Sequence, residues 1–132
     1  MKISTKGRYA LRIMVDIAEN SKNSIVSISG ISNRQEISNK YLEQIISKLV
    51  KAGFLESSRG QTGGYRLTKK PNEYTVGDIL RVSEGNLAPL KCLYDYKCSR
   101  QEGCSTYSFW EGLDKAINNY ADSITLEDLL KK

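Results

Sequence analysis

The sequence predicts a mostly α-helical chain that carries one small β-hairpin near its middle. Apolar residues recur at three- and four-residue intervals through much of the 132 residues, and a glycine-rich turn separates two short alternating runs. Hydrophobic residues make up 39% of the chain and charged residues 27%, which is typical of a globular protein. No apolar run approaches the roughly 18 residues that a membrane helix requires, and the charged opening residues do not resemble a secretory signal. Cytoplasm is therefore the expected compartment, with no membrane partner.

Three helices are predicted in the first part of the chain. The first runs from a Ser4 cap to about Asn20, a second follows a Ser27 cap, and a third runs from a Ser38 cap to a stop at Gly53. Their apolar stripes are Leu11, Met14, Val15 and Ala18 in the first, Ile28 and Ile31 in the second, and Leu42, Ile45, Ile46 and Leu49 in the third. The last two helices are joined by a tight polar turn, which is the helix-turn-helix pattern.

A β-hairpin is predicted directly after the third helix. Residues 54–58 and 65–67 read as two short strands, and the intervening segment 59–64 contains three glycines that permit a tight turn. A hairpin in this position is the wing of a winged helix-turn-helix. We therefore expect residues 1–70 to form one winged helix-turn-helix domain.

Residues 71–132 are expected to form a second region, with a sensor loop and a long helix. Pro71 ends the preceding unit, and Thr75 is expected to cap a helix. The segment 85–105 is predicted to be a loop, and a loop of this length in a small protein often binds a ligand. A long helix is predicted from about Thr106. Its apolar face consists of Phe109, Leu113, Ala116, Ile117 and Tyr120.

Charge is distributed unevenly along the chain. Residues 1–70 carry 13 Lys and Arg against 5 Asp and Glu, a net charge of +8. Residues 71–132 carry 7 against 10, a net charge of −3. A basic first part favours a polyanionic partner such as DNA, and a solvated basic surface without a partner is the alternative.

The third helix carries side chains suited to contact base pairs. A helix enters the major groove of DNA when its outer face is small or polar enough to meet base edges. The candidate DNA-binding residues on this face are Ser38, Asn39, Lys40, Tyr41, Glu43 and Gln44. Gln44 is suited to pair with adenine, and Glu43 to discriminate between sequences rather than to add affinity. The alternative is an ordinary amphipathic helix with a solvated outer face.

Further DNA contacts are expected from the wing and from the start of the chain. Arg59 suits the minor groove or a phosphate, and Gly60 permits close backbone approach. Four basic residues are candidate phosphate contacts that set register without reading sequence: Lys2, Lys6, Arg8 and Arg12. A nucleotide-binding loop is a weaker interpretation of the glycines, because the Lys-Ser/Thr ending and the following helix are missing.

Three cysteines lie in the predicted loop: Cys92, Cys98 and Cys104. Their spacing lacks the C-x2-C pairs of zinc ribbons, and three thiols cannot all pair in disulfides. Three thiolates suit a soft metal or an iron–sulfur cluster, while unligated thiols and a thiol-based redox switch are alternatives. The chain contains no histidine, which removes many catalytic and metal-site options.

Four segments carry a resemblance to the Rrf-type winged-helix regulators: MKISTKGRYA, ISNKYLEQIISKLVKAGFL, SRGQTGGYRL and TVGDIL. The resemblance covers nearly the whole chain, and the cysteine spacing is similar to that of iron–sulfur members of the family and, less closely, of nitric-oxide sensors. It implies a homodimer in which the long C-terminal dimerisation helix crosses its partner. It also implies DNA contacts by Tyr41, Gln44 and Arg59, operator choice tuned by Glu43, and a 2Fe–2S cluster on the three cysteines, with a 4Fe–4S cluster as the alternative.

One position departs from the pattern of the iron–sulfur members. They usually carry a histidine three residues after the third cysteine, where this sequence has Tyr107. The fourth cluster ligand therefore stays open. The alternatives are an oxygen from Tyr107, Glu102 or Asp95, a group from the partner chain, or a small external thiol.

These observations lead to one main functional hypothesis and two others. The main hypothesis is a non-enzymatic repressor that binds a double-stranded DNA operator under the control of an iron–sulfur cluster and regulates cluster-biogenesis or related genes. The second is a repressor of the same family without a stable cluster, responsive to cysteine metabolism or to nitric oxide and redox state, with a metabolic enzyme as partner. The third, a thiol oxidoreductase, is disfavoured because the chain lacks a C-x-x-C motif and a histidine base.

Overall fold

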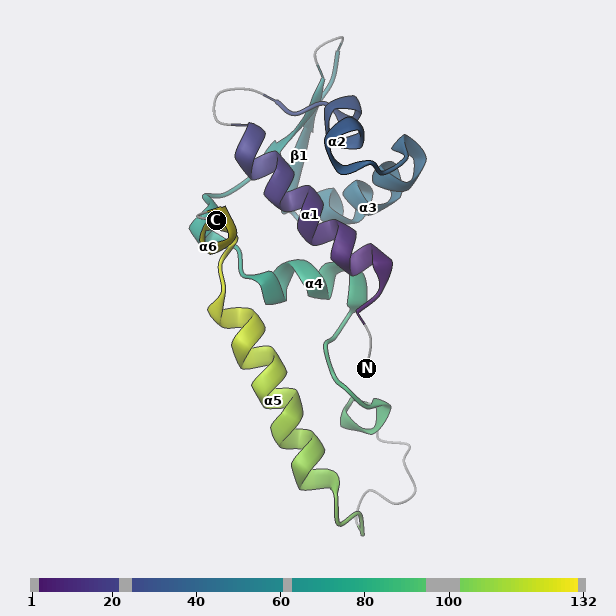
Figure 1. Cartoon of the computed structure of the whole chain (residues 1–132), viewed down its shortest axis with the longest axis vertical. Coiled ribbons are helices and arrows are strands. Elements are labelled where there is room, and N and C mark those ends of the chain that lie inside the picture. The colour runs from purple at the N-terminus through teal and green to yellow at the C-terminus, as the bar shows by residue number, and fades with distance from the viewer. Residues whose placement is uncertain (1–2, 22–24, 61–62, 95–102, 131–132) are drawn as a thin grey trace.

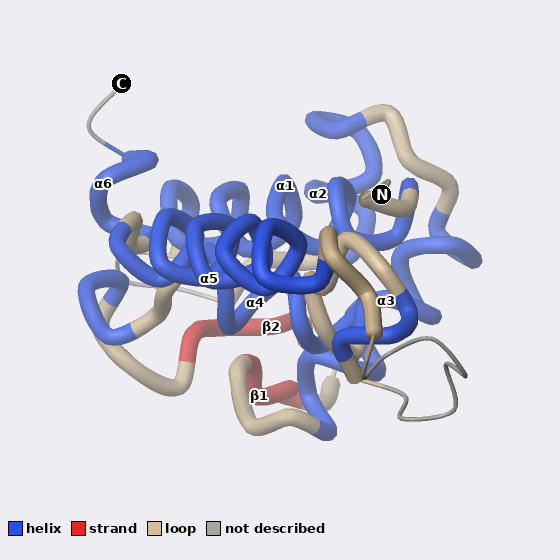
Figure 2. Tube along the Cα trace, turned by 90° about the horizontal axis from the view of Figure 1, so that it is seen from below, coloured by secondary structure: helices blue, strands red, loops and turns tan. Residues whose placement is uncertain are grey.

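The computed structural model describes residues 3–21, 25–60, 63–94 and 103–130 (Figure 1). In this part of the chain the helices are α1 (Thr5–Asn20), α2 (Ile28–Gln35), α3 (Asn39–Lys51), α4 (Val76–Glu84), α5 (Tyr107–Ser123) and α6 (Leu126–Leu130). The same part of the chain contains two strands, β1 (Leu55–Ser58) and β2 (Gly64–Leu67). It also contains two 3-10 turns, η1 (Pro71–Glu73) and η2 (Lys91–Leu93). The predicted fold class, mostly helical with one small hairpin, is confirmed (Figure 2).

The predicted helix caps are present in the structure. Ser4, Ser27, Ser38 and Thr75 each accept a hydrogen bond from the backbone N–H three residues further on, at distances of 2.9–3.3 Å. Each cap satisfies one of the backbone donors that a helix start leaves without a partner. The end of α3 also follows the prediction, since Gly53 adopts a left-handed φ of 81° just beyond the helix.

The hairpin is joined to the segment before α2 by a third, shorter pairing. Strands β1 and β2 pair in an antiparallel register from Leu55 opposite Leu67 to Ser58 opposite Gly64. In addition, the Val26 N–H donates to the Tyr65 carbonyl at 2.9 Å, and the Tyr65 N–H donates to the Val26 carbonyl at 2.8 Å. The sequence analysis did not predict this bridge. It attaches the wing to the helix-turn-helix through backbone hydrogen bonds.

Helix α1 lies at the centre of the core. Its side chains Ile13 and Met14 are fully buried, and it packs against α2, α3, α4 and α6. Tyr74, Ile79 and Leu126 belong to the same buried cluster as the apolar stripe of α3. The core therefore extends across residue 70, and the division of the chain into two functional parts stays a prediction.

Tyr74 connects the base of the hairpin to the start of α4. Its side chain is 1% exposed, and its hydroxyl donates to the Phe54 carbonyl at 2.8 Å. The same oxygen accepts hydrogen bonds from the backbone N–H groups of Thr68 and Lys69, each at 3.0 Å. These bonds satisfy the polar end of a buried tyrosine, as its burial requires.

Helix α5 extends away from the rest of the chain (Figure 1). It begins after Thr106, as predicted, and is anchored mainly at its C-terminal end, where the Val76 N–H donates to the Ile124 carbonyl at 2.8 Å. Ala121 is its only buried side chain. Within the described ranges, no helix combines the length and the apolar character needed to cross a lipid bilayer.

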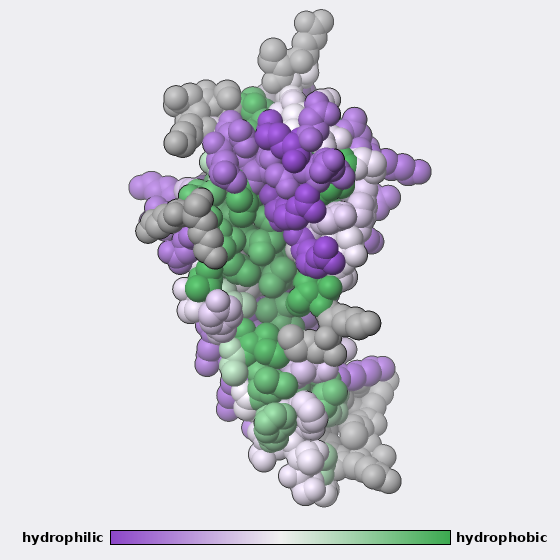
Figure 3. All heavy atoms as spheres, viewed as in Figure 1, coloured by the Kyte–Doolittle hydropathy of each residue, from purple (hydrophilic) through white to green (hydrophobic). Residues whose placement is uncertain are grey.

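An apolar surface follows α5 toward the junction of α1 and α4 (Figure 3). Phe109 and Tyr120 on α5 are 62% and 71% exposed, although both are large hydrophobic side chains. Tyr120 also lines a groove of about 400 Å³, whose other side chains are almost entirely apolar and include Leu11, Leu80 and Ile117. We refer to the exposed apolar side of α5 together with this groove as the α5 face.

Candidate nucleic-acid interface

Helix α3 presents its polar side to solvent, as the sequence analysis predicted. The buried stripe consists of Leu42, Ile45, Ile46 and Leu49. The exposed residues of its cap and first turns are Ser38, Asn39, Lys40, Glu43 and Gln44. Hydrogen-bonding groups are thus available to a ligand along the leading half of the helix.

Tyr41 differs from its neighbours on α3 because it is half-buried. Its ring packs edge-on against the ring of Tyr9 on α1, with 5.5 Å between the centroids. The guanidinium of Arg12 lies 5.1 Å from the centroid of the Tyr9 ring. This contact places the first half of α1, which carries the exposed residues Lys6 and Arg8, beside the first turn of α3.

Arg12 has an internal role that the sequence did not reveal. Its Nε donates to Gln35 Oε1 at 3.1 Å, and its Nη2 donates to the Gln35 carbonyl at 2.5 Å. The guanidinium therefore contributes to holding α1 against α2. Lys2, another of the four basic residues proposed as phosphate contacts, lies outside the described residues.

Arg59 and Gly60 are exposed near the tip of the wing. Gly60 has a φ of 116°, and its carbonyl accepts a hydrogen bond from the Gly63 N–H at 3.0 Å. A φ in this range is readily adopted only by glycine, so the turn depends on this residue. Gln61 and Thr62, between them, lie outside the described residues.

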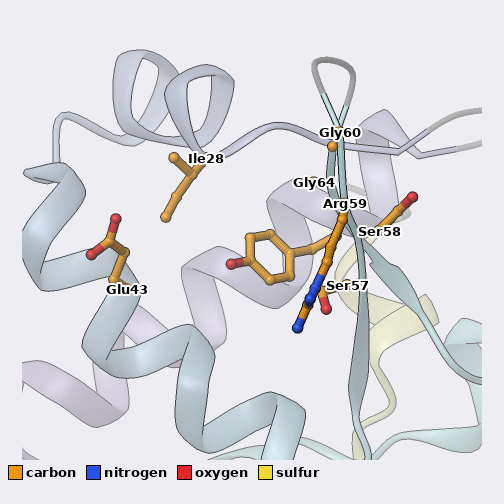
Figure 4. Close-up of a pocket in the computed structure, with 9 residues that line it drawn as sticks. Ile28, Glu43, Ser57, Ser58, Arg59, Gly60 and Gly64 are labelled. Atoms are coloured by element: carbon orange, nitrogen blue, oxygen red, sulfur yellow. The ribbon is translucent and has the colours of Figure 1, made fainter.

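A groove of about 450 Å³ separates α3 from the wing (Figure 4). Glu43 on α3 and Arg59 on the hairpin stand on opposite walls, and Ile28, the first residue of α2, lies above them in this view. Ser57 and Tyr65 also line the groove. The sequence analysis had not selected these two or Ile28 as site residues, because their strand and helix patterns gave only a structural signal.

The segments that carry Cys92 and Cys104 lie beside α5, away from the wing. Cys92 belongs to η2, which packs against α5, and Cys104 precedes the first turn of that helix. Both are half-buried, and Cys104 Sγ lies 3.4 Å from Thr106 Oγ1. Cys98 and the proposed oxygen ligands Asp95 and Glu102 lie outside the described residues. Within the described part, no three His, Cys, Asp or Glu side chains are arranged to hold a metal ion.

Two ion pairs connect neighbouring helices, one between α1 and α2 and the other between α4 and α5. Arg34 donates to Asp16, and this hydrogen bond raises the pKa of Arg34 although partial burial opposes the shift. Arg81 on α4 donates to Asp122 on α5, and this bond lowers the pKa of Asp122 while it raises that of Arg81. Arg34, Arg81 and Asp122 therefore stay ionised near neutral pH.

An exposed polar helix beside a hairpin, with a groove between them, defines the class of winged helix-turn-helix proteins. Residues 3–132 match the Rrf2 family model, described as an iron-dependent transcriptional regulator. The chain belongs to the Rrf2 family of transcriptional regulators.

Individual relatives extend this comparison. The transcriptional regulator IscR of Aliivibrio salmonicida is 40% identical over 98% of this chain and 77% of its own length. The solved structure of CymR, the global cysteine regulator of Bacillus subtilis, has a TM-score of 0.82 at 40% identity and covers 99% of this chain and 97% of its own. The structure of T. potens IscR has a TM-score of 0.79 at 42% identity, over 99% and 87%. These relatives are named as regulators, in agreement with the predicted non-enzymatic role.

Proposed function

We propose that this Rrf2-family regulator is a cytoplasmic homodimeric repressor that binds operator DNA through α3 and the wing. The observation that carries the proposal is the groove between them, with Glu43 and Arg59 on its opposite walls. Helix α3 is proposed to enter the major groove, where the exposed Gln44 and Glu43 meet base edges. The wing then reaches the adjacent backbone or minor groove with Arg59 and Gly60.

The remaining proposed contacts fix the position of the protein on the duplex. Ser38, Asn39 and Lys40 surround the start of α3, where backbone N–H groups and the helix dipole favour a phosphate. Lys6 and Arg8 lie on the neighbouring helix α1 and add positive charge on its exposed side. Tyr41 is proposed to contact DNA with the hydroxyl end of its half-buried ring.

We further propose that Cys92, Cys98 and Cys104 hold an iron–sulfur cluster, either 2Fe–2S or 4Fe–4S. The donor chemistry fits, since thiolates are the usual cluster ligands and two of the three lie on segments beside the same helix. When bound, such a cluster supplies a redox- and iron-dependent charge at that end of the molecule. Among the alternatives for the fourth ligand, Tyr107 lies within the described residues, half-buried in the first turn of α5.

A second copy of the chain is the proposed occupant of the α5 face. Phe109 and Tyr120 are exposed on a helix whose other end is tied to the core, so they are available to a neighbour. A two-fold contact through the same surface on both copies would bury them and would place two α3 helices on one duplex. Half-sites about one helical turn apart would then match the dimer.

A second candidate function is favoured by the likeness to CymR, which extends over almost the whole of both chains. In that case the protein represses genes of cysteine metabolism, with a metabolic enzyme as partner, and the thiols hold no stable cluster. The absence of histidine from the sequence also fits this candidate.

One experiment separates the two candidates. The protein is purified without air, and its iron and sulfide content, visible absorption and electron paramagnetic resonance are measured. DNA binding is followed on a duplex selected by the wild-type protein from a randomised library, here called the selected duplex, and on a base-shuffled version of it, the shuffled duplex. Cys92→Ala, Cys98→Ala and Cys104→Ala should each remove iron, whereas the matched control Ser105→Ala should retain it. Iron-free protein that binds the selected duplex normally would exclude the cluster and leave the second candidate.

A further inference from the structure

Asp16 is a buried carboxylate in the middle of the helix-turn-helix. Its side chain is 2% exposed, and it is the one charged residue buried in the described part of the chain. Arg34 Nε donates to Asp16 Oδ2 at 2.9 Å, and Arg34 Nη2 donates to Asp16 Oδ1 at 2.8 Å. Gln35 Nε2 adds a third bond, to Asp16 Oδ2, at 2.9 Å. One residue of α1 thus holds the last two residues of α2.

Gln35 is also held from its other side. Arg12, one helical turn before Asp16 on α1, donates to both the side-chain oxygen and the backbone carbonyl of Gln35. We refer to Asp16, Arg12, Arg34 and Gln35 as the α1–α2 clamp. Because Arg12 also stands over the Tyr9 ring that packs on Tyr41, the clamp is connected to the first turn of α3.

Apolar packing alone gives α2 a weak hold on the core. The helix has only eight residues, and Ile31 is its single buried side chain. Polar contacts at the C-terminal end of α2 therefore contribute much of what fixes its orientation on the core. A bidentate pair between a carboxylate and an arginine admits one relative orientation, whereas packed aliphatic side chains tolerate several.

The end of α2 is coupled to the start of α3 by a very short turn. Glu36 adopts a left-handed conformation with φ 55° and ψ 46°, Ile37 is buried, and Ser38 already caps α3. Ser32 Oγ donates to the Ile37 carbonyl at 2.6 Å and closes this turn. A displacement of Gln35 is therefore passed on to the exposed face of α3.

We propose that Asp16 is a positioning residue for DNA recognition, which sets the orientation of α3 through the α1–α2 clamp without contact to DNA. This proposal rests on the proposed docking of α3. A buried ion pair of this kind often adds little net stability over apolar replacements, so orientation is the better account of its presence. The hydrogen bond that Arg34 donates to Asp16 raises the pKa of Arg34.

Asp16→Asn and Gln35→Ala test the proposal, with Glu19→Gln as the matched control. Glu19 is an exposed carboxylate on the same helix, one turn further on. Affinities for the selected and the shuffled duplex are measured under conditions where circular dichroism shows each variant to be folded. Each clamp variant should lose about tenfold in preference for the selected duplex, while affinity for the shuffled duplex stays within about twofold. The Glu19→Gln variant should keep the full preference.

Several outcomes decide the proposal. Equal losses on both duplexes, or an unchanged preference in both clamp variants, would overturn it. If Asp16→Asn fails to fold, Gln35→Ala decides alone, because Gln35 is partly exposed and its loss leaves the Asp16–Arg34 pair intact. Arg34→Lys, which keeps the charge but not the bidentate geometry, should reproduce the loss of preference. If Gln44→Ala also leaves the preference unchanged, the proposed docking of α3 on DNA is wrong, and not only the proposed role of the α1–α2 clamp.

Discussion

The guanidinium of Arg81 on α4 donates to both carboxylate oxygens of Asp122 on α5, at 2.8 and 3.0 Å. The same guanidinium reaches Asn118 Oδ1 at 2.7 Å, so one arginine holds two turns of α5. Because α4 packs directly on α1, this contact is one of the polar connections between the long helix and the core.

The Arg81–Asp122 pair should contribute to stability in a pH-dependent way. The hydrogen bond from Arg81 lowers the pKa of Asp122 below its ordinary value of 3.8, so the carboxylate binds its proton more weakly in the folded chain than in the unfolded chain. The contribution is therefore complete above the ordinary pKa and is lost as pH falls through the lower, folded-state pKa. Urea unfolding should show Asp122→Asn less stable than wild type at neutral pH, with the gap closing in strong acid.

Asp78→Asn is the control for that measurement. Asp78 lies 3.6 Å from Arg81 on the same helix and is half exposed, so its pairing is weaker and more screened. A gap of equal size for both variants, or one that persists in strong acid, would contradict the account.

Arg59→Ala should weaken DNA binding by about 1–3 kcal/mol and reduce the salt dependence of affinity by about one unit of the log–log slope. The reason is the loss of one cation from the wing side of the groove. Arg66→Ala is a matched control on the same hairpin, where Arg66 is already paired with Glu56 across the strands. Fluorescence anisotropy over a range of salt concentrations measures both effects. Equal losses in the two variants would show that the wing acts only through its overall charge.

Glu43→Gln should change selectivity more than affinity. A carboxylate beside phosphates repels every duplex, and only a matching base compensates for that repulsion. The variant should therefore bind the shuffled duplex more tightly than wild type does, with less preference for the selected duplex. Glu111→Gln makes the same change of charge on α5 and should alter neither value. Lower affinity for both duplexes would argue that Glu43 supports the fold.

Two glycine substitutions should have opposite effects on stability. A Cβ atom at Gly64 would lie 2.3 Å from the Val26 carbonyl oxygen, so Gly64→Ala should destabilise the fold by about 1–3 kcal/mol. A Cβ at Gly112, within α5, meets nothing within 4 Å, and Gly112→Ala should stabilise the helix by roughly 0.5–1 kcal/mol. Chemical unfolding of both variants measures the difference. A neutral Gly64→Ala would mean that the bridge to Val26 is easily displaced.

Tyr120→Glu should separate dimers into monomers. The side chain is 71% exposed on the α5 face, and a charge there would have to be buried by the proposed second copy. Asn119→Glu places the same charge one residue away and should leave the dimer intact. Sedimentation velocity measures both. Wild-type protein that sediments as a monomer at micromolar concentration would remove the proposed interface.

The elements of this fold could be predicted because their signals are local. A cap at Ser38 and the stop at Gly53 depend on residues within one turn, and the stripe of α3 is visible in its spacing. The exposure of the polar residues on the other side of α3 followed directly from that stripe. The family resemblance added the expected roles of Tyr41 and Arg59, which stay predictions until DNA binding is measured.

The features that the sequence did not reveal depend on pairs of residues far apart in the chain. Nothing in the local pattern distinguishes Asp16 or Arg12 from other charges on α1, and their partners on α2 follow only from how the helices pack. The same holds for the pairing of Val26 with Tyr65. Arg12 is predicted to be a phosphate contact, and the hydrogen bonds from its guanidinium to Gln35 could not be predicted from the sequence.

The pairing of Val26 with Tyr65 has a consequence for the length of DNA that one subunit can read. The segment before α2 is joined to the wing by main-chain hydrogen bonds, so the position of the wing against the helix-turn-helix does not depend on the side chains at Val26 and Tyr65. Each half of a recognised site must then offer its two contacted stretches at a constant interval. If two copies pair as proposed, inserted or deleted base pairs are tolerated only in the spacer between the two halves of the site, because the contact between the copies sets that distance.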